Sequence, residues 1–228
     1  MFNFQEFDQA GKDLYMLGLV DTCGGSVSVR NGERFYITKK GAMLGHLREA
    51  DIVEISIAGE GNTEGVDPGE LQVHRAIYVE TNFNSVVHAF PPYGIALSIS
   101  TENKIMPQDM RGQAVLRSIP VVRARVNSAG RDKMASEELV RFLPPVFKSG
   151  YVAALVKEYG SFTAGSGLFE ALQFTTCLES SCKILAISKS LTGAEKPRRP
   201  EQQVRRSALP PSIGVMGRSR DSKRGFGR

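Results

Sequence analysis

Apolar and polar positions along the first 191 residues alternate between helical and strand periodicities. Near the start, four apolar side chains lie close to one face of a helix, namely Phe4, Phe7, Leu14 and Leu17. The segments SVSVR and ERFYIT come next and flank Asn31-Gly32, a dipeptide that favours a tight type I′ turn. The pattern therefore predicts an opening helix followed by a β-hairpin.

The middle of the chain continues this alternation. The pattern predicts a strand at DIVEIS, a helix at ELQVHRAIYVETN, a strand at SVVHAF, a short helix at PYGIALSIS and a strand at IPVVRARV. Ser136 and the two glutamates after it are expected to begin a helix. That helix is expected to end before Pro144-Pro145, because proline breaks a helix interior.

The last part of the body has the composition of a buried strand, YVAALV, followed by a hairpin from Gly160 to Gly167. A long amphipathic helix is expected after it, since apolar side chains recur at three- and four-residue steps at Ala171, Phe174, Leu178, Cys182 and Leu185. Strands and helices do not repeat as strict βαβ units. We therefore expect an α/β/α layered domain with a largely antiparallel sheet.

Length and composition place this domain in an ordinary size class. The chain has 228 residues, 41% of them hydrophobic, which suffices for one full core. It contains no run of 18 apolar residues, so no membrane span is expected, and its start does not resemble a secretory signal, so a cytoplasmic location is expected. Its three cysteines show no CxxC spacing, which argues against a disulfide framework and against a cysteine zinc site.

The net charge of +5 is concentrated at the end of the chain. Residues 192–228 hold ten Lys or Arg against three Asp or Glu, a net of +7, so residues 1–191 carry −2. This segment is rich in Pro, Gly, Ser and Arg and lacks apolar periodicity, which predicts a disordered tail behind a domain of residues 1–191. A basic tail can contact a polyanion such as nucleic acid, but solubilising tails of this composition are common, so polyanion contact is the less favoured of the two roles.

Three blocks of the body resemble a known family in order and in spacing. They are TCGGSVSVRNGERFYITKKG, GELQVHRAIYVETNFNSVVHAFPPYGIALS and ALVKEYGSFTAGSGLFEALQFTTCLESSCKIL, which together span roughly residues 4 to 191. The first is similar to a Gly-rich turn and hairpin, the second to a helix, strand and His-x-His-Pro-Pro turn, and the third to a strand, His-Gly turn, strand and helix. This is the pattern of the class II aldolase and adducin head domain, so the resemblance implies a three-layer α/β/α class II aldolase-like fold.

The resemblance also implies a set of site residues. Enzymes of this family hold a zinc ion with three histidines, and the ion stabilises the enediolate formed when a C–C bond breaks. By position, Glu70 matches the proton-transferring glutamate and His88 the first zinc ligand. Phe90 and Tyr159 stand at the other two ligand positions, so two of three ligands are missing. We therefore expect no tightly bound cofactor, with Zn²⁺ as the alternative.

Three roles for His88 follow from this departure. The first is a remnant of the metal site, an ordinary histidine at a strand end that is hydrogen-bonded to backbone. The second is a reduced metal site made of Glu70, His88, Tyr159 and water. The third is acid/base chemistry together with Glu70, because imidazole titrates near neutral pH. His74, one helical turn after Glu70, is expected to pack on the same helix face rather than to bind a metal.

Two loops match those that hold the substrate phosphate in sugar-phosphate members of the family. They comprise Gly24, Gly25 and Ser26, and Lys40 with Gly41. Backbone N–H groups and a lysine suit an anion. The family usually has Asn where Ser26 stands and hydroxyl residues where Pro68 and Gly69 stand, which weakens the match. Without a phosphate, the same residues would form a tight turn and a solvated lysine pair.

Two classes of function remain open from the sequence. The preferred one is a non-catalytic member of the family that keeps the fold for binding or scaffolding as a homo-oligomer, possibly a tetramer. The alternative is a divergent metal-dependent aldolase or epimerase, an aldehyde-lyase acting on a small phosphorylated sugar. A further histidine able to reach Glu70 would favour the alternative, and His46 is the one left unassigned.

Overall fold

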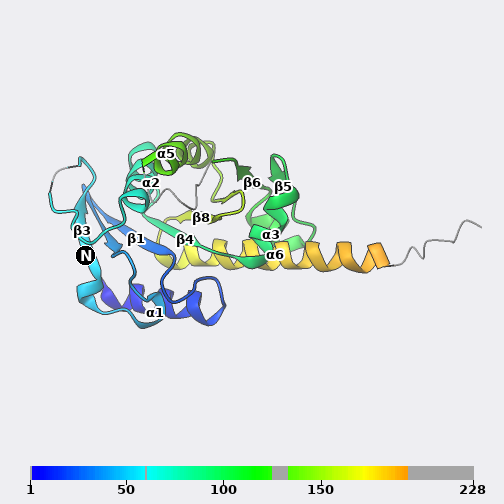
Figure 1. Ribbon diagram of the computed structural model, residues 1–228, viewed down its shortest axis with the longest axis horizontal. Coiled ribbons are helices and arrows are strands. Elements are labelled where there is room, and N and C mark those ends of the chain that lie inside the picture. The colour runs from blue at the N-terminus through cyan, green and yellow to red at the C-terminus, as the bar shows by residue number, and fades with distance from the viewer. Residues whose placement is uncertain (1, 60, 125–132, 195–228) are drawn as a thin grey trace, which may run out of the picture. The chain divides into compact units, whose positions relative to one another are not determined.

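A mixed sheet forms the centre of the computed structural model, which describes residues 2–59, 61–124 and 133–194. In these residues, eight strands follow the order β3-β2-β1-β4-β8-β7-β6-β5 (Figure 1). Neighbouring strands are antiparallel except β6 and β7, which are parallel. The strands are β1 Ser26–Asn31, β2 Arg34–Thr38, β3 Ile52–Ser56, β4 Ser85–Ala89, β5 Lys104–Ile105, β6 Ile119–Val122, β7 Ala153–Val156 and β8 Gly160–Gly165. The predicted largely antiparallel sheet is confirmed.

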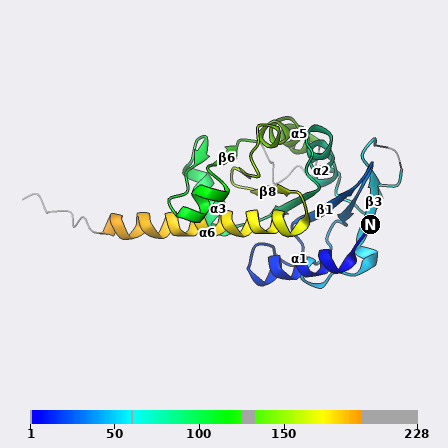
Figure 2. The ribbon, with the colours of Figure 1, turned by 180° about the vertical axis from the view of Figure 1, so that it is seen from behind.

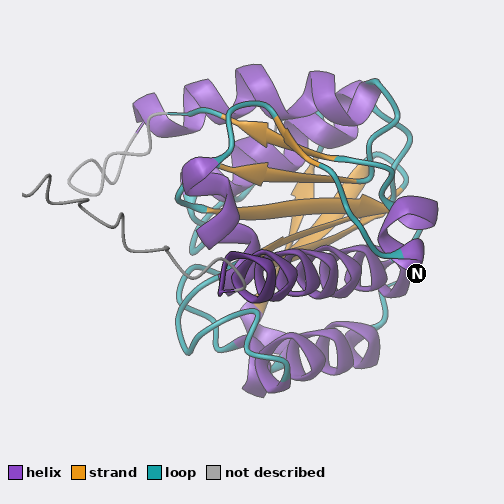
Figure 3. Ribbon diagram, turned by 90° about the vertical axis from the view of Figure 1, so that its right-hand side faces the viewer, coloured by secondary structure: helices purple, strands orange, loops and turns teal. Residues whose placement is uncertain are grey.

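Helices cover both faces of this sheet, which gives the three expected layers (Figure 3). One face carries α2 and α5, and the other carries α1 and α6 (Figures 1 and 2). The helices are α1 Phe4–Met16, α2 Pro68–Glu80, α3 Pro92–Ser100, α4 Met110–Val115, α5 Lys133–Lys148 and α6 Leu168–Ala194. Two short 3₁₀ turns, η1 Leu44–His46 and η2 Glu49–Asp51, connect β2 to β3. Within the described residues, no helix is both long and apolar enough to cross a membrane.

Alternation along the central strands decides which side chains face α2. On β1, Val27 packs into the apolar cluster under α1 and α6. Since successive side chains point to opposite faces of a sheet, the neighbours Ser26 and Ser28 face α2 instead. On β4, Val87 packs toward α1 and α6, so His88 faces α2 as well. Two strands thus present polar groups to a single helix.

The predicted hairpin is confirmed, but the predicted turn type is wrong. Asn31 pairs with Arg34, so the two loop residues are Gly32 and Glu33 rather than Asn31-Gly32. Gly32 has a φ of 63°, whereas Glu33 does not have a positive φ. A type I′ turn needs positive φ at both central residues, and a type II′ turn needs it only at the first. The turn therefore has the type II′ pattern, with glycine at the position that requires it.

The helix predicted from Ser136 to before Pro144 is also longer than expected. It begins at Lys133 and continues through Pro144 and Pro145 to Lys148. An internal proline costs about 3 kcal/mol, because it removes a hydrogen bond and crowds the preceding turn. Leu143 and Phe147 flank the prolines and are fully buried, and burying such a side chain contributes about 1.5–3 kcal/mol. Two prolines thus cost about 6 kcal/mol and packing of these two residues returns about 3–6 kcal/mol, so it offsets much of the disruption.

Several boundaries near the C-terminus differ from the prediction. Gly160–Gly165 is a single strand, and the hairpin turn precedes it, where β7 and β8 pair. The strand predicted at IPVVRARV covers only Ile119–Val122, and its last two residues lie outside the described residues. Helix α6 extends to Ala194 and so includes the first three residues of the predicted tail. The rest of that tail lies outside the described residues.

Candidate functional site

The start of α2 sets the position of the site. Asp67 is the N-cap of this helix, and its carboxylate accepts hydrogen bonds from the backbone N–H groups of Gly69 and Glu70. Pro68 at the first helical position suits a helix start, since its missing N–H would have no partner there. The ammonium of Lys40 lies 2.9 Å from the second Asp67 oxygen. The loop that holds Lys40 is thereby attached to the end of the helix that carries Glu70.

Glu70 lies at the centre of a cluster drawn from four segments. One carboxylate oxygen accepts a hydrogen bond from Ser26 Oγ at 2.6 Å and lies 3.5 Å from His74 Nε2. The other lies 2.8 Å from His88 Nδ1 and 3.4 Å from the Tyr159 hydroxyl, which donates to it. The side chain is 16% exposed, whereas His74 and His88 are fully buried. Glu70 and Tyr159 are thus the partly accessible members of a largely buried polar group.

Electrostatics keep this carboxylate ionised. Burial alone would raise the pKa of Glu70, but the two neighbouring histidines outweigh it and hold that pKa well below its ordinary value. Burial and the nearby charge of Glu70 raise the pKa of Tyr159, so its phenol stays protonated. The site therefore pairs a carboxylate that can accept a proton with a phenol that can donate a hydrogen bond.

Aromatic rings surround His88. Its ring stacks on Phe162 with centroids 4.3 Å apart and planes at 2°, and on Tyr159 with centroids 5.0 Å apart. Phe90 approaches edge-on at 4.9 Å. Neither ring nitrogen makes a hydrogen bond, because the short contact to Glu70 lacks hydrogen-bond geometry and acts only as an electrostatic contact. The expectation that His88 bonds to backbone is wrong, since ring packing fixes its orientation instead.

A three-histidine zinc site does not fit these residues. Phe90 has no donor atom, and the phenol of Tyr159 is protonated and directed at Glu70. The buried Nε2 of His88 has no partner, but the enclosing rings supply no second ligand. Within the described residues, no group of three or more His, Cys, Asp or Glu side chains could hold a metal ion. At two of the three positions that the family resemblance assigns to zinc ligands, the side chains therefore lack the donor chemistry that zinc requires.

The first predicted phosphate loop lies directly against this cluster. A Cβ added to Gly25 would lie 2.9 Å from the carbonyl oxygen of His88, and its φ of 87° also favours glycine. A Cβ on Gly24 would lie 2.4 Å from the ring of Phe90. These glycines therefore let the loop approach β4 and the Phe90 ring closely. In the second loop, Gly41 is exposed with a φ of 73°.

Other polar residues of the site were not singled out from the sequence. Ser28 and Tyr78 are fully buried and hydrogen-bonded to each other at 2.7 Å. His74 was expected to pack on the Glu70 face of α2, and it does, with each ring nitrogen close to a serine hydroxyl. The sequence did contain a signal for this group. Ser26 and Ser28 are two residues apart, as on one face of a strand, and the polar residues Glu70, His74 and Tyr78 recur every four residues, as on one face of a helix. The unassigned His46 is exposed and lies beside Tyr15.

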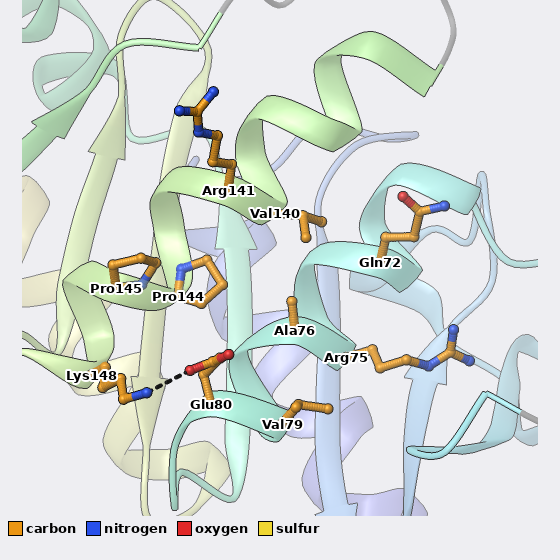
Figure 4. Close-up of a pocket in the computed structure, with 10 residues that line it drawn as sticks. All are labelled: Gln72, Arg75, Ala76, Val79, Glu80, Val140, Arg141, Pro144, Pro145 and Lys148. Atoms are coloured by element: carbon orange, nitrogen blue, oxygen red, sulfur yellow. Dashed lines mark hydrogen bonds and ion pairs between the residues drawn. The ribbon is translucent and has the colours of Figure 1, made fainter.

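A separate groove of about 690 Å³ runs between α2 and α5 (Figure 4). An ion pair of 2.8 Å between Glu80 and Lys148 joins its two walls at one end. It is lined by Gln72, Arg75, Ala76, Val79, Glu80, Val140, Arg141, Pro144, Pro145 and Lys148. None of these residues belongs to the Glu70 cluster. The groove and the candidate site are therefore distinct features of the same helix.

Comparisons with known proteins cover the whole region that holds the cluster. The profile of the family described as "Class II Aldolase and Adducin N-terminal domain" matches residues 5–186. An L-fuculose phosphate aldolase of Methanocaldococcus jannaschii is 28% identical over 187 residues, covering 81% of this chain and 96% of that protein. Another from Methanococcus vannielii is 30% identical over 183 residues, covering 80% and 94%.

Solved structures agree with the sequence comparisons. The crystal structure of L-fuculose-1-phosphate aldolase from Thermus thermophilus superposes with a TM-score of 0.74 at 30% identity. That match covers 85% of this chain and 97% of the other. The described fold is therefore a class II aldolase-like fold over nearly the full length of that protein.

Proposed function

This chain belongs to the class II aldolase and adducin N-terminal domain family, and from that premise we propose that it is an aldolase or epimerase acting on a small phosphorylated sugar. Its relatives named L-fuculose phosphate aldolase support the substrate class. The preferred expectation from the sequence was a non-catalytic protein. The names of the relatives favour the enzyme, which was the alternative.

The observation that carries the proposal is the ionised Glu70 in a nearly buried polar cluster. Taking a carboxylate out of water is costly, and strongly perturbed acids of this kind concentrate at functional sites. The ionised form is the one that accepts a proton. Glu70 would therefore move the proton that aldol chemistry or epimerisation requires, as the family glutamate does.

Other residues of this chain would bind and orient the substrate. The protonated Tyr159 hydroxyl, which donates to Glu70 at 3.4 Å, would turn its single proton from that carboxylate to a substrate oxygen placed beside it. The loop of Gly24, Gly25 and Ser26 and the loop of Lys40 and Gly41 would contact the phosphate through backbone N–H groups and the lysine. No step is assigned to a metal ion, because the donor set does not fit one.

Turnover of ketose 1-phosphates tests this proposal. The full-length protein would be incubated with a panel that includes L-fuculose 1-phosphate, and loss of the substrate signal followed by ³¹P NMR. We expect substrate-dependent turnover by the wild type, in samples with and without added Zn²⁺. No turnover and no ligand-induced rise in melting temperature across the panel would overturn the proposal.

A second candidate function has its own supporting observation. Phe90 stands at a position that the resemblance assigns to a ligand, and the rings of Phe90, Tyr159 and Phe162 close around His88. Both features favour a non-catalytic homo-oligomer that keeps the fold for binding or scaffolding. Light scattering on the full chain, read beside the turnover assay, separates the two candidates. An inactive protein with a mass several times one chain supports the scaffold, whereas an inactive monomer at tens of micromolar contradicts it.

We expect purified protein to hold well under one zinc ion per chain after extensive dialysis. A structural zinc site provides roughly 10–16 kcal/mol of apparent binding free energy at neutral pH, and it needs a full set of N, S or O ligands. His88 is the single imidazole at the three ligand positions. Elemental analysis measures this directly. A stoichiometric content of zinc, manganese or iron would contradict the expectation and make Tyr159 the first residue to replace.

A further inference from the structure

A continuous chain of buried hydrogen bonds leads from Tyr78 to Glu70. The Tyr78 hydroxyl lies 2.7 Å from Ser28 Oγ, which lies 2.6 Å from His74 Nδ1. On the other side of the imidazole, Nε2 lies 2.8 Å from Ser26 Oγ, which donates to Glu70 at 2.6 Å. All members except Glu70 are at least 97% buried. Each hydroxyl and each ring nitrogen of the chain has a partner within it.

An ionised Glu70 and a neutral His74 together fix the direction of every bond. An ionised carboxylate can only accept, so Ser26 uses its single hydroxyl proton on Glu70. Ser26 Oγ must then accept a proton from His74 Nε2. Burial lowers the pKa of His74 against the opposing effect of Glu70, so the ring is neutral and Nδ1 has no proton.

The second half of the chain follows in the same way. Since Nδ1 is an acceptor, Ser28 must donate its proton to His74. Ser28 Oγ can then only accept from the Tyr78 hydroxyl. Burial raises the pKa of Tyr78, which keeps that proton on the phenol. All four donors therefore point the same way, toward the Glu70 carboxylate.

We propose that Tyr78, Ser28 and His74 are positioning residues, which form a one-way hydrogen-bond relay that fixes the orientation of the Glu70 carboxylate through Ser26. The proposal rests on Glu70 being the proton-transfer group of the proposed function. Aligned hydrogen bonds polarise one another in a medium of low dielectric constant, so the remote hydroxyls strengthen the last bond to the carboxylate. His74 acts as a neutral link and not as a metal ligand.

The location of the relay argues against a purely structural role. Its serines occupy two fully or nearly fully buried positions of a central strand, on the sheet face whose apolar cluster is formed by strands, α2 and α5. Apolar side chains of similar size would fill those positions without leaving polar groups that need partners. Instead, each polar group is hydrogen-bonded to the next, and the last bond is made to one carboxylate oxygen of Glu70. The arrangement serves the accessible end, which is Glu70.

The tautomer of His74 tests the relay without any measurement of activity. In ¹⁵N-labelled wild-type protein at pH 7, long-range ¹H–¹⁵N correlation spectra report which ring nitrogen carries the proton. We expect the neutral Nε2–H form for His74, assigned by its disappearance in His74→Gln. An imidazolium or an Nδ1–H form would overturn the relay, whether or not the protein turns over a sugar phosphate.

Kinetics of a Ser28→Ala variant test the positioning role. Removing one hydrogen bond of about 1.4 kcal/mol corresponds to a tenfold change, so we expect kcat to fall about tenfold while KM stays within twofold. Ser28→Thr, which keeps the hydroxyl, should recover most of the loss. Ser85→Ala is the matched control, because this buried serine makes one long bond, to Gly165, outside the relay. Equal kcat in Ser28→Ala and wild type would overturn the positioning role.

Two further outcomes distinguish a failure of the relay from a failure of the proposed function. A Tyr78→Phe variant should keep the Nε2–H form, since Ser28 still donates to His74, and should lower kcat by a smaller factor than Ser28→Ala. If Ser28→Ala does not fold, Tyr78→Phe and the wild-type spectrum carry the test. If His74 has the Nε2–H form but the protein turns over no sugar phosphate, the relay geometry is supported and only the proposed function is contradicted.

Discussion

A Glu70→Gln variant is expected to lose about 10²–10³-fold in kcat on any ketose 1-phosphate that the wild type turns over. General acid/base catalysis contributes roughly 10²–10⁴-fold, and a carboxylate with a low pKa is a weak base, which places the effect toward the lower end. Glutamine keeps the size of the side chain but cannot accept the proton. Steady-state rates with a circular dichroism spectrum of the folded variant provide the measurement.

A carboxylate elsewhere on the same helix supplies the control. Glu80 lies ten residues, or nearly three turns, further along α2 and pairs with Lys148 at the surface. Glu80→Gln removes the same charge from the same helix without touching the cluster, so its kcat should remain within twofold of the wild type. If Glu70→Gln retains full activity, the assignment of Glu70 to proton transfer is wrong and the site must be sought elsewhere.

A Gly11→Ala variant is expected to unfold at a melting temperature roughly 4–8 °C below the wild type. A Cβ at this position would lie 2.1 Å from the backbone carbonyl oxygen of Leu44, which cannot rotate away as a side chain could. Overpacking of this kind costs about 3 kcal/mol, whereas the gain in helix propensity returns about 1 kcal/mol. The net loss of about 2 kcal/mol corresponds to that shift for a domain of this size.

Gly167 is the matched position for this measurement. No atom lies within 4 Å of a Cβ built there, and its φ is outside the left-handed range. Gly167→Ala should therefore melt within about 1 °C of the wild type. Scanning calorimetry on the two variants compares the same substitution with and without the clash. Equal melting temperatures would mean that α1 and η1 separate at little cost.

Most elements of this fold could be predicted from the sequence because their signals are local. The apolar side chains that predicted α6, for example, recur within three or four residues of one another. The elements that were missed have no comparable signal, since β5 has two residues and α4 has six. The two prolines of α5 indicated a helix end, but contacts with α2 and the sheet override the local preference.

Part of the candidate site could be predicted from the sequence, and part of it could not. Glu70, His88, Phe90 and Tyr159 could be chosen by their resemblance to a family pattern, and the structure places all four together. Their roles stay predictions. The relay through Ser28 could not be predicted, because it depends on the register of β1 against β4 and on the rotation of α2 above them. Neither the strand register nor the helix rotation can be read from a single segment of the sequence.

The two adjacent prolines of α5 also have a consequence for the dynamics of that helix. Neither Pro144 nor Pro145 has an N–H group, so the carbonyls of Val140 and Arg141 lack the amide that would normally bond to them one turn later. The two halves of α5 are therefore joined by side-chain packing instead of a continuous ladder of hydrogen bonds. In native-state hydrogen exchange they should behave as separate opening units, with a step in protection at the prolines.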